Sequence, residues 1–187
     1  TPLKWWESSD WRVIFHDGNP AILRPATLPI TSDSVHQYAP CSVSSVQERS
    51  LPDGFSHASR HKLDIGYHLF GPGADANGIF ERYCKLQDAI SPLEKNARKH
   101  RLLGYADLIQ NDVFAEAEII AEQQDSHVDW YEDPNSRVVN WLLLLQVDSD
   151  SAANMCWGDL GRLYYCIKHD DLLERRFDKI ACVMQCT

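Results

Sequence analysis

The fold is decided by residues 141–187, WLLLLQVDSDSAANMCWGDLGRLYYCIKHDDLLERRFDKIACVMQCT, the last part of the 187-residue chain. Apolar and β-branched residues predict strands over 138–147, 162–167 and 179–185. Glycine and aspartate at 157–161 predict a tight turn before the second strand, and residues 169–175 predict a short helix before the third. We therefore expect a strand, turn, strand, helix, strand unit within an α+β domain.

The residues that precede this unit predict two helices and several short strands. Apolar spacing indicates helices over 79–90 and 113–124, and Asp112 is a suitable N-cap for the second. Short strands are predicted over 11–16, 21–24 and 41–49. Between them, aperiodic sequence at about 50–78, with Asp53-Gly54 and Asn77-Gly78, predicts a long irregular excursion. The length fits a single domain over 1–187.

Composition narrows the class of partner. The net charge of −9 and the pI near 5.3 argue against nucleic acid, whose binding needs Lys and Arg against phosphates. A basic protein partner fits this charge better, although acidity also serves solubility alone. The longest apolar run, Trp141–Leu145, is too short to cross a membrane. Six scattered cysteines predict free thiols and a cytoplasmic location.

The segment 157–162 is the first candidate site. Two glycines permit positive φ, and Arg162 offers five donors that suit a carboxylate. We expect an ion pair between Asp159 and Arg162 that locks a structural turn. The alternative is that Trp157, Asp159 and Arg162 contact a ligand or partner.

A second polar cluster lies before the 113–124 helix and after the main strand. The candidate binding residues of both clusters are Asp107, Gln110, Asp112, Asp148, Trp157, Asp159 and Arg162. Paired carboxylates serve general acid–base catalysis and also bind hard cations, but the spacing is not that of a calcium loop.

Histidines concentrate at His57, His61 and His68, which makes them weak metal candidates. On a helix, His57 and His61 would share one face, as zinc ligands do. The segment has loop-like sequence, and Ala58 stands where a metalloprotease motif has glutamate, so we expect a solvated loop. No nucleophile elbow, phosphate loop or dinucleotide fingerprint occurs, and the sequence predicts no catalytic residue and no cofactor.

A family resemblance accompanies these motifs. It is carried by Leu103-Gly104-Tyr105, Gln110-Asn111-Asp112, Trp141 to Leu145, Trp157-Gly158-Asp159, Gly161-Arg162-Leu163-Tyr164 and Gln185-Cys186. This ordered set, mainly over residues 102–187, resembles the YwqG-like bacterial family, a domain of unknown function. A departure occurs where that family tends to have Gly-Gly-Tyr-Pro, since position 103 is Leu and position 106 is Ala.

The resemblance has consequences for fold and function. It implies an α+β fold with helices packed on an antiparallel sheet. Because Trp11-Arg12-Val13 resembles a mid-domain strand of the family, it also implies first strands before Thr1, and so an N-terminally incomplete domain. Members often lie beside bacterial polymorphic toxin systems, which suggests a neutralising role.

Three functional hypotheses follow. The preferred one is a cytoplasmic, non-enzymatic protein of immunity type that binds and neutralises a basic toxin or effector. The second is a small-molecule or metal-dependent enzyme that uses an Asp/Arg pocket. The third is a module of a larger regulatory protein.

Overall fold

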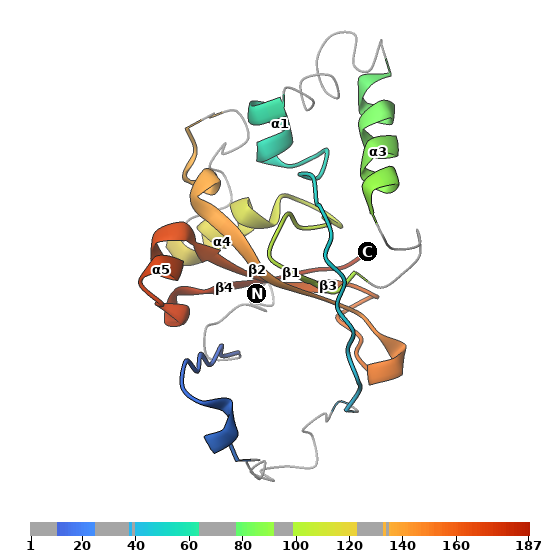
Figure 1. Ribbon diagram of the computed structural model, residues 1–187. Helices are drawn as coiled ribbons and strands as arrows, with labels where there is room; N and C mark the ends of the chain where they lie inside the picture. The colour runs from blue at the N-terminus through green and yellow to red at the C-terminus, as the bar shows by residue number, and fades with distance from the viewer. Residues whose placement is uncertain are drawn as a thin grey trace.

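A four-stranded antiparallel sheet with helices packed on it forms the centre of the molecule, as Figure 1 shows for the computed structural model. The structure describes residues 11–24, 38, 40–63, 78–91, 99–122, 133 and 135–187. The strands are β1 (Arg101–Leu102), β2 (Trp141–Asp148), β3 (Arg162–Lys168) and β4 (Ala181–Gln185), in that order across the sheet. The helices are α1 (His57–Leu63), α3 (Ile79–Ile90), α4 (Val113–Glu122) and α5 (His169–Leu173). The α+β fold expected from the sequence is confirmed.

The C-terminal unit forms as predicted, with adjusted boundaries. Residues 137–140 form a 3-10 turn rather than the start of the main strand, because Ser136 caps it by accepting a hydrogen bond from the Val138 amide. Another 3-10 turn, Phe177–Lys179, precedes β4, which begins two residues later than expected. The predicted tight turn is present, closed by a 2.7 Å hydrogen bond from the Gly161 amide to the Trp157 carbonyl.

A bulge in β2 determines which face its polar residues occupy. The register against β3 shifts between Leu143 and Leu145, so one extra residue enters the strand. Trp141 and Leu143 are buried before the bulge, and Gln146 and Asp148 are buried after it. In regular alternation Gln146 would face away from Leu143. The bulge therefore places a glutamine and an aspartate on the helix-covered face.

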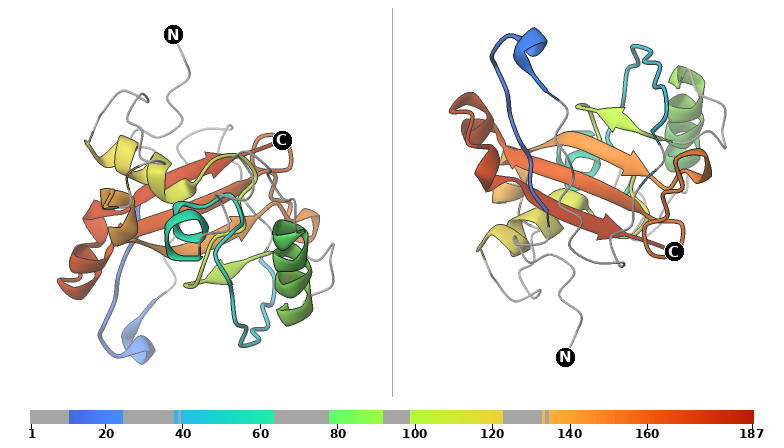
Figure 2. Two further views of the ribbon diagram at one scale, coloured as in Figure 1. Left: turned by 90° about the horizontal axis from the view of Figure 1, so that it is seen from above. Right: turned by 90° about the horizontal axis from the view of Figure 1, so that it is seen from below.

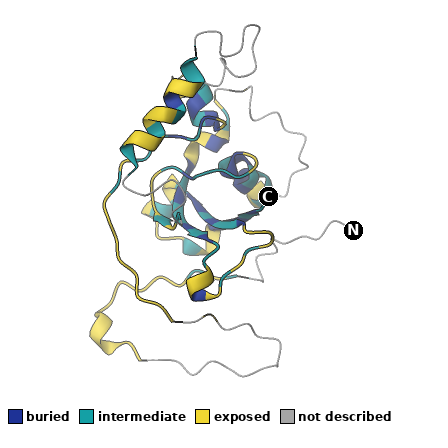
Figure 3. Ribbon diagram, turned by 90° about the vertical axis from the view of Figure 1, so that its right-hand side faces the viewer, coloured by how far each residue is buried: buried dark blue, intermediate teal, exposed yellow. Residues whose placement is uncertain are grey.

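The core lies between that face and α4 (Figure 2, left). Val113 and Ala117 of α4 pack with apolar residues from three strands, and burial is concentrated there in Figure 3. The Trp141 indole donates a 2.8 Å hydrogen bond to the Glu118 carboxylate, which satisfies its buried N–H. Asp112 caps α4 as predicted, since its Oδ1 accepts from the Phe114 amide at 2.8 Å.

The opposite face of the sheet carries an extended N-terminal arm, residues 11–24, which lies below the sheet in Figure 1 and crosses in front of the strands in the right half of Figure 2. The Trp11 ring meets the Tyr165 ring edge-on at 6.0 Å, and Phe15 stacks on Phe177 at 4.6 Å. The strands predicted over 11–16, 21–24 and 41–49 are wrong. These segments are extended or turn-like, with a 3-10 turn at Pro20–Ile22, and have no ladder partner among the described residues.

The excursion expected at about 50–78 is partly wrong, because His57–Leu63 form helix α1 within it. Residues 64–77 of the excursion lie outside the described residues. The segment that precedes α1 is tied to α3: the Pro52 carbonyl accepts from Tyr83 Oη at 2.7 Å and from Gln87 Nε2 at 2.9 Å.

Two further sequence expectations concern thiols and membranes. All six cysteines are unpaired, and Cys166 and Cys182 are buried, where burial raises the pKa of both thiols. Among the described helices, none combines the length and hydropathy needed to span a membrane.

Candidate functional site

Two rows of polar residues cross the sheet at one end and face the same side. In the register, Asp148 lies opposite Arg162, which lies opposite Gln185. In the adjacent row, Gln146 lies opposite Tyr164. Both rows lie beneath residues 103–112, here called the β1–α4 loop.

Gln146 holds the first half of the β1–α4 loop by hydrogen bonds. Its side chain is fully buried. Its Oε1 accepts from the Asp107 amide at 3.0 Å, and its Nε2 donates to the Lys99 carbonyl and to Asp107 Oδ2, the latter at 3.1 Å. A buried amide with all its polar atoms engaged holds the main chain in one position.

Gln185 is also fully buried, and it holds the second half of the β1–α4 loop by hydrogen bonds. Its Oε1 accepts from the amides of Ile109 at 3.0 Å and Gln110 at 3.2 Å. Its Nε2 donates to the Asn111 carbonyl at 2.7 Å and to Glu116 Oε1 at 3.0 Å. The two glutamines thus fix the loop mostly through its main chain.

Asp107 is the charged centre of the loop. Its Oδ2 accepts from Arg101 Nη1 at 2.7 Å, and its Oδ1 lies 3.6 Å from Lys99 Nζ. The Asp107 carbonyl accepts from Tyr164 Oη at 2.7 Å and from Arg162 Nη1 at 3.0 Å. Burial raises the pKa of Tyr164, so its hydroxyl remains a donor. Both the carboxylate and the carbonyl of Asp107 are therefore engaged by the protein.

The expected ion pair between Asp159 and Arg162 is wrong. Arg162 Nε instead lies 3.2 Å from Asp148 Oδ1, because the β2–β3 register places these two residues opposite each other. Asp159 is exposed in the turn, and its carbonyl accepts from Thr187 Oγ1 at 3.0 Å. Trp157 joins the Asp148 end of the sheet through a 3.2 Å hydrogen bond from its indole to the Asp148 carbonyl.

The other predicted site residues have partners other than Asp107. Gln110 is exposed and donates through its side chain to the Cys186 carbonyl at 2.6 Å. Asp112 is buried under α1, where its Oδ2 accepts from the His57 amide at 2.7 Å. Burial raises the pKa of Asp112. The structure thus brings Asp107, Asp148 and Arg162 together, whereas Gln110, Asp112 and Asp159 bond to other groups.

The solvated histidine loop expected from the sequence is wrong as well. His57 and His61 are on helix α1 with their rings 4.4 Å apart, and His57 is only 2% exposed. The His57 ring contacts the Asp133 carbonyl at 2.8 Å. His68 lies outside the described residues. Within the described part of the chain, no three His, Cys, Asp or Glu side chains are placed to hold a metal ion.

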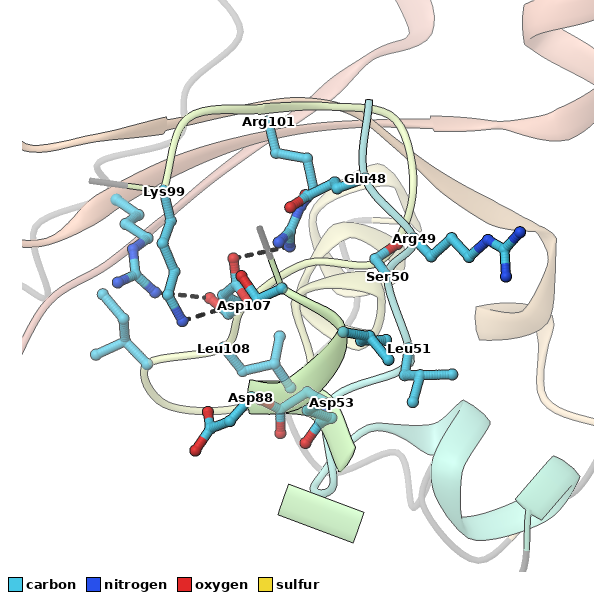
Figure 4. Close-up of a pocket in the computed structure, with 15 residues that line it drawn as sticks. Glu48, Arg49, Ser50, Leu51, Asp53, Asp88, Lys99, Arg101, Asp107 and Leu108 are labelled. Carbon is cyan, nitrogen blue, oxygen red and sulfur yellow. Dashed lines mark hydrogen bonds and ion pairs between the residues drawn. The ribbon is translucent and has the colours of Figure 1, made fainter. Parts of the chain in front are cut away.

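A polar cleft of about 540 Å³ opens beside Asp107 (Figure 4). The sheet side and the loop contribute Lys99, Arg101, Asp107 and Arg162. The facing side comes from residues 48–53 and from the C-terminal turn of α3. Most of the side chains that line it are polar or charged.

Asp53 is a cleft residue that the sequence analysis missed. Its Oδ1 accepts from the Phe55 amide at 2.9 Å, and burial raises its pKa, with the Asp107 carboxylate adding to the shift. Asp53-Gly54 is typical of a turn, and no local signal indicates that the turn lies against residue 107, more than fifty positions away.

A comparison with protein-family models identifies a family. The family model described as Domain of unknown function (DUF1963) matches residues 2–186. A comparison with curated proteins finds no match.

Proposed function

We propose that this chain, which belongs to the DUF1963 family, is a cytoplasmic binding protein of immunity type that neutralises a basic toxin or effector. The proposal extends the resemblance to the YwqG-like bacterial family, whose members often lie beside polymorphic toxin systems. The formal charge of −9 supports it, because an acidic surface attracts a basic partner and raises the association rate.

The observation that carries the proposal is that the charged groups around Asp107 pair with one another and with other groups of the protein. Arg101, Asp107, Asp148 and Arg162 form ion pairs with other side chains of the protein, and Asp107 and Arg162 also hold the loop to the sheet. A general acid, base or nucleophile must be able to reach a substrate. Because these charged side chains are paired within the protein, they favour a binding protein over an enzyme.

The edge of the sheet offers such a surface. Leu102 is 74% exposed and Leu103 is 53% exposed. Leu103 has φ of +60°, a backbone conformation that costs a leucine about 1 kcal/mol or more, and its amide is held by the Leu144 carbonyl at 3.2 Å. An exposed leucine kept in this conformation is unusual. We assign it a recognition role.

Two exposed valines extend this surface. Val43 and Val46, 91% and 64% exposed, belong to the extended segment 40–50, which passes the β1 edge in Figure 2. The ion pair between Glu48 and Arg101 ties this segment to β1. We call Val43, Val46, Leu102 and Leu103 the β1-edge surface, and exposed apolar groups of this kind serve as docking sites.

The test uses the protein and the products of its neighbouring genes. We expect one of these to be captured at micromolar concentration, with an association rate that falls as salt rises. Leu102→Asp and Leu103→Asp should each weaken the complex by tenfold or more, as is typical of a central interface residue. Aspartate tolerates positive φ better than leucine, so Leu103→Asp should fold. Leu173→Asp is the control, because Leu173 is 69% exposed on α5.

Two results would contradict the proposal. One is the absence of a complex with any neighbouring gene product at micromolar concentration. The other is an equal loss of binding in the Leu173→Asp control, which would show that the loss is not specific to the β1-edge surface.

An enzyme that uses the Asp/Arg pocket is the second candidate, and Asp53 favours it. This carboxyl lines the cleft and has a pKa raised by burial, as a general acid requires. Turnover of a small metabolite that is lost in Asp53→Asn and retained in Glu81→Gln, an exposed position on α3 outside the cleft, would support this candidate.

A further inference from the structure

The cleft beside Asp107 has one cationic wall. Lys99 Nζ lies 3.6 Å from its carboxylate neighbour Asp107, which is beyond hydrogen-bonding distance, so the ammonium keeps its donors for another group. Arg162 pairs through Nε with Asp148 and donates through Nη1 to the Asp107 carbonyl, which leaves the donors of Nη2 for a ligand. Both side chains line the cleft, and Lys99 projects into it in Figure 4. This wall suits a carboxylate.

The facing wall is acidic. Asp53 and Asp88 lie together on it in Figure 4, and among the described residues neither is paired with a cation. Arg49 lines the same side, but its guanidinium points away from the two aspartates in Figure 4. The C-terminal turn of α3, which ends at Ile90, lines the same wall. The last carbonyls of a helix are left without intrahelical donors and carry partial negative charge. This wall suits an ammonium group.

Both walls are held in place without a ligand. Tyr83 and Gln87 of α3 bond to the Pro52 carbonyl, and the Phe55 and Phe80 rings meet edge-on at 5.5 Å. On the other side, Ser50 Oγ accepts from the amide of Tyr105 in the β1–α4 loop at 3.0 Å. A preformed cleft loses little free energy to ordering when a ligand binds.

We propose that the cleft binds a small zwitterion of about dipeptide size, its carboxylate toward Lys99 and Arg162 and its ammonium toward Asp53 and Asp88. A simple anion would also face the two aspartates, and a simple cation would face the lysine and the arginine. Leu108 lies between the walls and supplies apolar surface for a side chain. The volume of about 540 Å³ falls within the range of small-molecule sites. This binding function is independent of the proposed protein partner.

The test is calorimetric titration of the whole chain with glycyl-leucine and two capped forms. N-acetyl-glycyl-leucine lacks the ammonium, and glycyl-leucinamide lacks the carboxylate. We expect glycyl-leucine to bind and each capped form to bind at least about tenfold more weakly, because each loses a charge-assisted contact.

Matched variants locate the site. Lys99→Met and Asp88→Asn should each weaken glycyl-leucine binding about tenfold, since each removes one charge from a wall. Lys85→Met and Glu81→Gln are the controls: these residues form an exposed i,i+4 pair on α3 outside the cleft and should leave affinity unchanged. Circular dichroism spectra establish that every variant is folded.

Three outcomes would overturn the proposal. The first is that glycyl-leucine gives no heat of binding up to about 10 mM, a concentration above the dissociation constant of an ordinary ligand. The second is that the capped forms bind as tightly as the zwitterion. The third is that the control variants lose as much affinity as the cleft variants. The titration involves no partner protein, so its failure would leave the proposed immunity function standing.

Discussion

Replacing Gln185 by leucine tests whether the buried glutamines hold the β1–α4 loop. Gln185→Leu keeps the side-chain volume similar and removes four hydrogen bonds, to the amides of Ile109 and Gln110, the Asn111 carbonyl and the Glu116 carboxylate. Each bond contributes about 1 kcal/mol net, and a buried group left unpaired costs about 1–3 kcal/mol. Water partly compensates at the loop side, and leucine gains apolar burial. We expect a loss of about 2–4 kcal/mol in the free energy of unfolding.

Urea denaturation followed by tryptophan fluorescence measures this loss. Gln110→Leu is the matched control, because Gln110 is exposed and makes one side-chain hydrogen bond, to the Cys186 carbonyl. It should cost less than about 1 kcal/mol. A Gln185→Leu variant within about 1 kcal/mol of the parent, or no less stable than the control, would refute the claim that buried glutamine amides organise the loop.

Three further substitutions test other parts of the structure. Gly161→Ala should destabilise the protein by at least about 2 kcal/mol in urea denaturation, because the added Cβ would lie 2.1 Å from the Gln185 carbonyl oxygen, a backbone atom with little room to move; stability equal to the parent would show that the turn adjusts freely. Tyr164→Phe should cost only about 1 kcal/mol, because an arginine still donates to the Asp107 carbonyl after the 2.7 Å hydrogen bond from the hydroxyl is lost; a loss above about 3 kcal/mol would contradict this sharing. Asp53→Asn should change the pH dependence of stability. Burial raises the folded-state pKa of this carboxyl above 3.8, so the folded state binds more protons than the unfolded state, and parent stability falls as pH rises from 3.8 through the folded-state pKa. The fall should be smaller in the variant, and identical pH curves would show that this carboxyl has an ordinary pKa.

The parts of the fold that the sequence predicted are those with strong local signals. The helix over 79–90 matches α3 at both ends, because its apolar spacing is helical and Pro92 follows closely. The start of α4 was predicted because an N-cap aspartate acts within two residues of itself. The strands from 141 onward combine β-branched and apolar residues with a glycine-rich turn.

The parts that could not be predicted depend on contacts between distant residues. Gln146 and Gln185 occupy strand positions where an apolar residue is expected. Their presence is explained by their hydrogen bonds to the backbone of the β1–α4 loop, which covers them. The partner of Arg162 is set by strand register, which puts Asp148 across from it, whereas the sequence favours the nearby Asp159. Local pattern carries no information on either point.

The N-terminal predictions failed for a related reason. Residues 11–16 have β-branched and aromatic residues, but a strand also needs a hydrogen-bonded neighbour, and the structure uses these side chains for ring contacts instead. His57 shows the opposite case. Its segment has few helical signals, yet tertiary contacts with Asp112 and with the Asp133 carbonyl support a helix there.

The way in which the two glutamines hold the β1–α4 loop has a consequence for protein engineering. Gln185 contacts the amides of residues 109 and 110 and the carbonyl of residue 111, which every amino acid except proline supplies in full. The side chains at 109 and 110 can therefore be randomised while the backbone beneath them keeps its path. A library built at these positions would diversify a rigidly mounted loop without re-engineering the sheet that supports it.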